Sequence, residues 1–177
     1  MKKNNKTTKK LLSSLLKSKN CMSCKSCCKF GENDCFDAPM FTEGEKENIL
    51  KKFNNAKFKK IGKLWKVVIV RGPNKHTFRY ICPFYNDKEY KCMVYDIRPF
   101  DCSTWPFYIM KLHDKVIITL SKDCPVILNN KLDFLLEFTE KIVAPYMIKY
   151  ALKYPDLITP YRNKAVILLD VTDKLKS

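Results

Sequence analysis

CMSCKSCC, residues 21–28, sets four cysteines at the spacing Cys-x2-Cys-x2-Cys-Cys. The two-residue spacing lets successive thiolates converge on one metal centre, and iron–sulfur proteins use the same Cys-x2-Cys-x2-Cys run to hold irons of a cubane cluster. A Cys-x2-Cys knuckle is equally typical of zinc, which then takes two distant ligands. The segment therefore predicts a fold organised around a metal site, with an iron–sulfur cluster or zinc as the cofactor.

The adjacent pair Cys27 and Cys28 constrains that site. Neighbouring side chains diverge by about 100° on a helix and about 180° on a strand. We therefore expect that the two thiolates do not serve one tetrahedral zinc together. One would complete the first centre, while the other faces a second centre or is a free nucleophile. A vicinal disulfide is the remaining alternative.

The chain length and the number of cysteines argue against a disulfide scaffold. The 177 residues are enough for a hydrophobic core, and nine cysteines are too few, and odd in number, for a small secreted disulfide-rich protein. The apolar run from Leu11 to Leu16 is shorter than a signal peptide requires, and no apolar stretch approaches the length of a membrane helix. We expect a cytoplasmic protein, in which clustered thiols stay reduced and bind metal.

A second set of cysteines is spread along the chain. Its members stand in Cys82-Pro83-Phe84, in Cys92-x2-Tyr95, at Cys102 and in Cys124-Pro125. These separations form no local knuckle, so the thiols can converge only through the fold. Taken singly, each is typical of a buried apolar thiol, but together with the first cluster they favour metal ligation.

The ordered set of motifs resembles the YkgJ-type cysteine-cluster family of zinc- or iron-chelating domains. The resemblance rests on four features: the 21–28 run, the Thr42–Glu45 segment after Pro39, the Cys82-Pro83-Phe84 and Cys92-x2-Tyr95 motifs, and Arg98-Pro99 with Cys102 and Pro106. It spans about residues 21 to 125. Two details depart from the family pattern, since Ser103 follows Cys102 where arginine is common, and Cys35 is an extra cysteine.

The resemblance implies metal chelation and does not imply a reaction. The implied ligands are Cys21, Cys24, Cys27, Cys28, Cys82, Cys92, Cys102 and Cys124. Whether the protein is an enzyme stays open.

Local patterns predict helices and hairpins around these cysteines. Thr42 and Glu45 match a capping box at the start of a helix that runs to about Phe53. The β-branched stretch 64–70, followed by turn residues and a strand at 77–81, predicts a hairpin. A second hairpin is predicted from strands 107–112 and 116–120, with its turn at residues 113–114.

The remainder of the chain reads as mainly helical. A helical pattern begins near Lys131 and must break or kink at Pro145, and a further helix extends to about Tyr154. Residues 165–171 fit a strand or a helix. We expect an α+β fold, a small single domain with short β-hairpins and two or three helices around the metal site. Its regions are a basic tail and short helix (1–20), a cysteine-cluster region (21–125) and a C-terminal helical extension packed on the same domain (126–177).

The net charge of +16 raises nucleic acid or another polyanion as a partner. The inference is weak, because lysine is spread along the whole chain, and metal-bound thiolates add negative charge that the formal count omits.

Other residues carry less specific signals. His76 and His113, the two histidines, are expected in exposed hairpin turns, although histidine could complete a zinc site. Arg98-Pro99 either preorganises a following helix start or places a cation beside the thiolates. Phe84, Tyr95, Trp105 and Phe107 could form an apolar shell around the metal or pack as ordinary core. The chain has no glycine-rich phosphate loop and no credible hydrolase triad.

Three functional hypotheses follow from these patterns. The leading one is an iron–sulfur protein with a redox or electron-transfer role. The second is a structural zinc module that mediates protein or nucleic-acid interaction. The third is a metal-handling protein that passes iron or zinc to a client.

Overall fold

A computed structural model describes residues 26–31, 36–73, 79–124, 127, 129–162 and 165–176. The predicted helix at Leu11–Leu16 and the turn containing His76 lie outside these residues. The chain divides into two compact units. The first, here called the cysteine unit, lies within Ser18–Ser103, and the second, the C-terminal unit, has its described residues within Thr104–Ser177.

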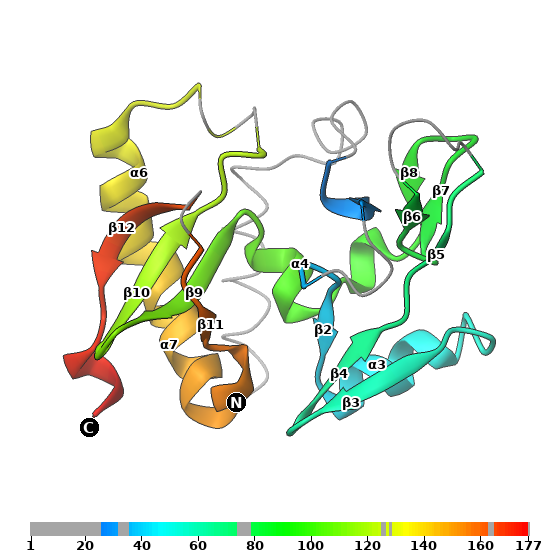
Figure 1. Ribbon diagram of the computed structural model, residues 1–177, viewed down its shortest axis with the longest axis horizontal. Helices are drawn as coiled ribbons and strands as arrows, with labels where there is room; N and C mark the ends of the chain where they lie inside the picture. The colour runs from blue at the N-terminus through cyan, green and yellow to red at the C-terminus, as the bar shows by residue number, and fades with distance from the viewer. Residues whose placement is uncertain are drawn as a thin grey trace. The chain divides into compact units, whose positions relative to one another are not determined.

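Small antiparallel sheets and short helices make up the described part of the cysteine unit (Figure 1). The sheets have the strand orders β1-β6-β5, β2-β4-β3 and β7-β8. In chain order the elements are η1 (Ser26–Cys28), β1 (Lys29–Phe30), β2 (Met40–Phe41), α3 (Glu43–Leu50), β3 (Phe58–Ile61), β4 (Leu64–Val67), β5 (Val70–Arg71), β6 (Tyr80–Ile81), β7 (Tyr85–Asn86), β8 (Lys91–Cys92), η2 (Tyr95–Ile97) and α4 (Phe100–Thr104).

Aromatic rings form the centre of this unit's core. Phe41 and Phe84 are each 1% exposed, and their ring centroids lie 6.1 Å apart in an edge arrangement. The Phe53 ring packs edge-on against Phe84, with centroids 5.4 Å apart. The Phe58 ring packs in the same way against Phe41, with centroids 5.2 Å apart. Edge contacts of this kind stabilise a core beyond the burial of apolar area alone. The core therefore joins β2, β3 and the segment that follows Cys82.

The capping box is confirmed and has a second role. The Thr42 hydroxyl accepts from the Glu45 amide, and the Glu45 carboxylate accepts from the Thr42 amide at 2.9 Å. The other carboxylate oxygen of Glu45 accepts from the backbone N–H of Phe100 at 2.8 Å. A second contact joins the same region: the Asp101 carboxylate in α4 accepts from the Met40 amide in β2 at 2.9 Å. Two carboxylates therefore fix α4 against β2 and α3.

The predicted strand at 64–70 is interrupted. Its first part is β4, which pairs with β3 through a turn at Gly62, and its second part is β5. β5 pairs antiparallel with β6, so the predicted hairpin forms with shorter strands. β3 was not expected, because its sequence Phe-Lys-Lys-Ile has few strand-favouring residues.

The C-terminal unit has a four-stranded sheet of order β11-β9-β10-β12 with helices across one face (Figure 1). The predicted hairpin at 107–120 is confirmed as β9 and β10, and His113 lies exposed in its turn at φ 54°. The undecided segment 165–171 is a strand, β12. The elements are β9 (Phe107–Leu112), β10 (Lys115–Leu120), α6 (Leu132–Phe138), the π-helix η3 (Thr139–Val143), α7 (Ala144–Lys153), η4 (Pro155–Leu157), β11 (Thr159–Pro160), β12 (Val166–Asp170) and η5 (Asp173–Leu175).

The helical run in this unit does not stop at Pro145. Instead, α6 passes through the π-helical turn η3 into α7, with the proline in the first turn of α7. Proline has no N–H for an i→i−4 hydrogen bond within a helix, and the bonding changes at this point to the π-helical pattern, in which the Ala144 amide donates to the Thr139 carbonyl. The predicted irregularity is therefore present, as a change of helix type immediately before the proline.

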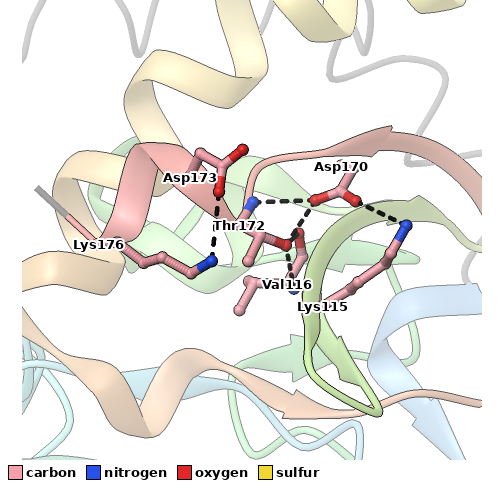
Figure 2. Close-up of polar contacts among 6 residues, drawn as sticks. All are labelled: Lys115, Val116, Asp170, Thr172, Asp173 and Lys176. Atoms are coloured by element: carbon pink, nitrogen blue, oxygen red, sulfur yellow. Dashed lines mark hydrogen bonds and ion pairs between the residues drawn. The ribbon is translucent and has the colours of Figure 1, made fainter.

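Polar contacts hold the end of β12 to the start of β10 (Figure 2). The Thr172 hydroxyl accepts from the Val116 amide at 2.9 Å and donates to the Asp170 carboxylate at 2.6 Å. The same carboxylate group pairs with the Lys115 ammonium at 3.3 Å. These contacts fix the end of β12 beside the turn end of the β9–β10 hairpin.

The described residues establish the α+β class. Within those same ranges, no helix has both the length and the apolar character needed to cross a membrane.

The dual contact of Glu45 gives a stability prediction. Glu45→Ala should lower the free energy of unfolding by about 1–3 kcal/mol, because the backbone donors of Thr42 and Phe100 lose a charged acceptor. Urea denaturation followed by circular dichroism measures the effect. Glu47→Ala, at an exposed position of the same helix, is the control. A loss no larger than that of the control would show that the bridge to Phe100 carries no stability.

Candidate metal centre

Backbone pairing brings the two predicted sets of cysteines together in the cysteine unit. Cys28 ends η1, and its carbonyl accepts from the Cys82 amide at 2.9 Å. This bond continues the β1–β6 ladder, in which Lys29 lies opposite Ile81. Positions separated by more than fifty residues therefore become neighbours.

A tight turn and a short ladder add Cys92. The Tyr85 amide donates to the Cys82 carbonyl at 3.0 Å, which closes a turn into β7. Tyr85 then lies directly opposite Cys92 in the β7–β8 pair, and the Met93 amide donates to the Phe84 carbonyl at 2.8 Å. Figure 1 shows β6, β7 and β8 as one group of short strands.

Cys102 is positioned by the Arg98-Pro99 segment. Arg98 has an extended backbone, and α4 starts at Phe100, directly after the proline, as expected for a residue that preorganises a helix start. The Ser103 amide and hydroxyl both donate to the Pro99 carbonyl, at 3.0 and 2.8 Å. Ser103 therefore stabilises the turn that carries Cys102.

Arg98 also supplies positive charge to the cysteines. Its guanidinium lies 3.8 Å from the centre of the Tyr95 ring. Its charge adds to the Cys28 hydrogen bond that lowers the pKa of Cys27, and at Cys92 it opposes the burial that raises the pKa of that thiol. Both roles considered for Arg98-Pro99 are therefore present in the structure, one in the backbone and one in the side chain.

Cys27 and Cys28 form a coupled thiol pair. Their sulfurs lie 3.9 Å apart, so they are not joined in a vicinal disulfide. A hydrogen bond from Cys28 lowers the pKa of Cys27, and Arg98 acts in the same direction. The pKa of Cys28 is raised by that hydrogen bond first and by burial second. Cys27 is therefore the more readily ionised thiol of the pair.

The other three cysteines of the unit are held as neutral thiols. Burial raises the pKa of Cys82 to about 12, and desolvation is the main cause that raises the pKa of Cys92 and of Cys102. For each of them, negative charge on other cysteines of the set raises the pKa further. Such a group is stabilised in its ionised form by a cation placed among the sulfurs.

The 3.9 Å between the sulfurs of Cys27 and Cys28 is the length of their hydrogen bond and is close to the about 3.8 Å that separates two sulfurs bound to one tetrahedral zinc. The expectation that these neighbours do not serve one zinc together stays a prediction.

The described cysteines alone do not complete a metal site. Among the residues that the structure describes, no three Cys, His, Asp or Glu side chains are placed to hold an ion. The predicted ligands Cys21 and Cys24, and the extra Cys35, lie outside these residues. Cys124 is buried in the C-terminal unit, whereas the other five described cysteines belong to the cysteine unit.

The aromatic residues considered as a shell divide between the two units. Phe84 belongs to the core of the cysteine unit, and Tyr95 lies under Arg98. Phe107 belongs to the C-terminal unit, where its ring centroid lies 6.3 Å from that of Phe138. Phe84 and Tyr95 are therefore the shell candidates within the cysteine unit.

Tyr85 is a site residue that sequence reasoning missed. It is 6% exposed, and its buried hydroxyl has no hydrogen-bond partner within the described ranges. Burial raises its pKa to about 12, and negative charge at Asp87 and then at Cys28 acts in the same direction. A buried donor without an acceptor is costly in a folded protein. Tyr85 lies opposite Cys92 in the β7–β8 pair, so this donor belongs to the same small sheet as one of the cysteines.

The donor set fits zinc or iron. Soft thiolates select these metals, the sulfurs come from separate segments that the fold gathers, and Arg98 offsets part of their negative charge.

Comparison with known proteins gives one match. A family model described as "CxxCxxCC: Putative zinc- or iron-chelating domain" matches residues 20–125, which is more than half of the chain. No curated protein and no solved structure matches the chain.

The buried Tyr85 hydroxyl, which has no hydrogen-bond partner among the described residues, predicts that its removal stabilises the protein. In protein freed of metal by a chelator, Tyr85→Phe should raise the free energy of unfolding by about 1 kcal/mol, because it removes a buried donor that lacks an acceptor. Tyr161→Phe is the matched control and should lower it by about 1 kcal/mol, since the Tyr161 hydroxyl donates to the Ala165 carbonyl at 3.0 Å. Urea titration of both variants tests the pair. A destabilised Tyr85→Phe protein would mean that the hydroxyl is already satisfied.

Proposed function

The chain belongs to the CxxCxxCC family of zinc- or iron-chelating domains, and we propose that it binds iron as an iron–sulfur cluster that serves in electron transfer or another redox step. The observation that carries this proposal is the gathering of Cys27, Cys28, Cys82, Cys92 and Cys102, which influence one another electrostatically in the cysteine unit. The run at residues 21–28 is also the spacing that cubane clusters use.

The proposed ligands are those implied by the motif and the fold. The run at 21–28 supplies the first three thiolates of the centre, and the remaining ligand or a second centre is drawn from the other cysteines. The full set is Cys21, Cys24, Cys27, Cys28, Cys82, Cys92, Cys102 and Cys124. When bound, an iron–sulfur cluster supplies one-electron redox chemistry at a potential that depends on charge, hydrogen bonds and solvent access.

Three side chains of the unit would set those conditions. Arg98 places a positive charge near Cys27 and Cys92 and so favours the ionised sulfurs. The Tyr85 hydroxyl offers a hydrogen bond to a thiolate, which lowers the electron density on that sulfur. Phe84 is buried beside Cys82 and excludes water from this side of the group.

A structural zinc site is the second candidate. It is favoured by the 3.9 Å separation between the sulfurs of Cys27 and Cys28, which agrees with an edge of a zinc–thiolate tetrahedron. The strands beside the cysteines, β1, β6, β7 and β8, are two residues long, and sheets this small often depend on a bound metal for stability. In that case the protein would serve as an interaction module.

Either site requires reduced thiols, from which we infer a reducing compartment such as the cytoplasm.

Metal and acid-labile sulfide analysis separates the two candidates. Protein purified without oxygen and without a metal-binding tag should be brown, with visible absorption and iron matched by sulfide. Zinc without colour or sulfide would reject the iron–sulfur proposal and support the structural site.

Serine substitution of single cysteines tests the ligand set. Cys27→Ser, Cys82→Ser, Cys92→Ser, Cys102→Ser and Cys124→Ser should each lower the metal bound per chain, because each removes a soft ligand. Cys35→Ser is the matched control and should keep the full amount. Elemental analysis gives the metal content, and circular dichroism shows whether each variant is folded. Full metal content in a folded Cys82→Ser or Cys92→Ser protein would refute the role of the second set.

A further inference from the structure

A long segment of the cysteine unit carries positive charge without any acidic residue. Between Glu47 and Asp87 there are eight lysines and two arginines, and no aspartate or glutamate. These ten cations make up most of the formal net charge of +16. The charge of the chain is thus less evenly distributed than its scattered lysines suggest.

The structure concentrates five of these cations on one hairpin, here called the basic hairpin and formed by β3, β4 and the residue before β3. Figure 1 shows β3 and β4 joined at a turn at one end of the unit. Lys59 lies directly opposite Lys66, and Lys63 lies in the turn beside Gly62. Like charges directly opposite each other destabilise a ladder, and a bound anion removes that cost. The lysines of the basic hairpin are Lys57, Lys59, Lys60, Lys63 and Lys66, and all but the partly buried Lys66 are exposed.

One side of the hairpin is partly neutralised by α3. Glu43 accepts from the Trp65 indole at 2.5 Å and pairs with Lys46, and the charge of Lys60 contributes to the lowered pKa of Glu43. The opposite side presents Lys59 and Lys66, because side chains alternate between the two faces of a strand. Lys59 and Lys66 therefore share the side of the hairpin away from Trp65, the residue that Glu43 contacts, and Lys63 lies at the turn.

The hairpin offers little of what a membrane-binding or base-stacking surface needs. None of the large apolar side chains of residues 58–67 is exposed, and beside them only Val68, which is 41% exposed, and Phe36, which is 46% exposed with the Lys66 ammonium 5.3 Å from its ring centroid, present apolar surface. The Trp65 ring is covered by the Lys46 ammonium, 3.6 Å from its centroid, which leaves this face closed to a base. Sequence-tolerant binding of single strands depends on such open aromatic faces.

We propose that the basic hairpin binds the phosphate backbone of double-stranded nucleic acid without reading its sequence. Duplexes suit this surface because both strands contribute phosphates, which doubles the charge per unit of length. Lysine acts at such a site as a point charge that tolerates varied phosphate positions. The inference is independent of which metal the cysteines hold.

Fluorescence anisotropy with a labelled duplex of mixed sequence tests the proposal on the metal-loaded protein. Affinity should fall about 100-fold between about 50 and about 200 mM salt if four lysines contact phosphates. The variant carrying Lys59→Gln, Lys60→Gln, Lys63→Gln and Lys66→Gln should lose most of this affinity. The slope of log affinity against log salt should decrease by about 0.9 for each contact removed.

A charge-matched variant controls for net charge. It carries Lys122→Gln, Lys131→Gln, Lys149→Gln and Lys174→Gln, at exposed positions of the C-terminal unit. This variant should keep the salt slope of the parent protein. An equal loss in both variants would show binding by overall charge and overturn the proposal, as would the absence of duplex binding.

Two further probes test the class of partner. A single strand of the same sequence should bind more weakly than the duplex, and tryptophan emission should change little, because Trp65 is covered. Stronger binding to phosphatidylserine-containing vesicles than to the duplex at the same salt would also overturn the proposal. Unchanged metal content and circular dichroism in both lysine variants would exclude misfolding as the cause of a lost signal.

Discussion

The hydrogen bond from the Cys82 amide to the Cys28 carbonyl is the contact on which the candidate centre depends. It extends the two-residue ladder between β1 and β6 and brings the N-terminal cysteine run beside the second set. After Cys82, the β7–β8 pair positions Cys92, and the helix α4, which starts directly after Pro99, carries Cys102. Each link is a backbone interaction, so the thiols are positioned by main-chain geometry and need not hold the fold themselves.

Local signals in the sequence predicted local structure well. The capping box at Thr42, the hairpin of β9 and β10, and the helix start after Pro99 all depend on residues close together in the chain, and all are present. The strand β3 escaped prediction because its two lysines disfavour a strand in isolation. Pairing with β4, which is decided by the tertiary fold, makes it one.

The cysteine motifs of the candidate site could be recognised in the sequence, whereas the contacts of residues around it, such as Tyr85 and Glu45, could not. The cysteine motifs identified the family and the set of thiols, although Cys21, Cys24 and Cys35 lie outside the described residues. No sequence pattern indicated that Tyr85 would be buried without a hydrogen-bond partner among the described residues, or that Glu45 would accept from Phe100. Such contacts join residues far apart in the chain, and no periodicity or motif encodes them.

The boundary between the two units falls inside the family region. The region ends at residue 125, after the β9–β10 hairpin, while the cysteine unit ends at Ser103. A fragment cut at residue 125 would keep this hairpin but lose its neighbour β12 and the helices that cover the sheet. Its buried side chains, among them Ile109 and Ile118, would then face water. The segment that defines the family by sequence is therefore not one that can be excised as a folded unit.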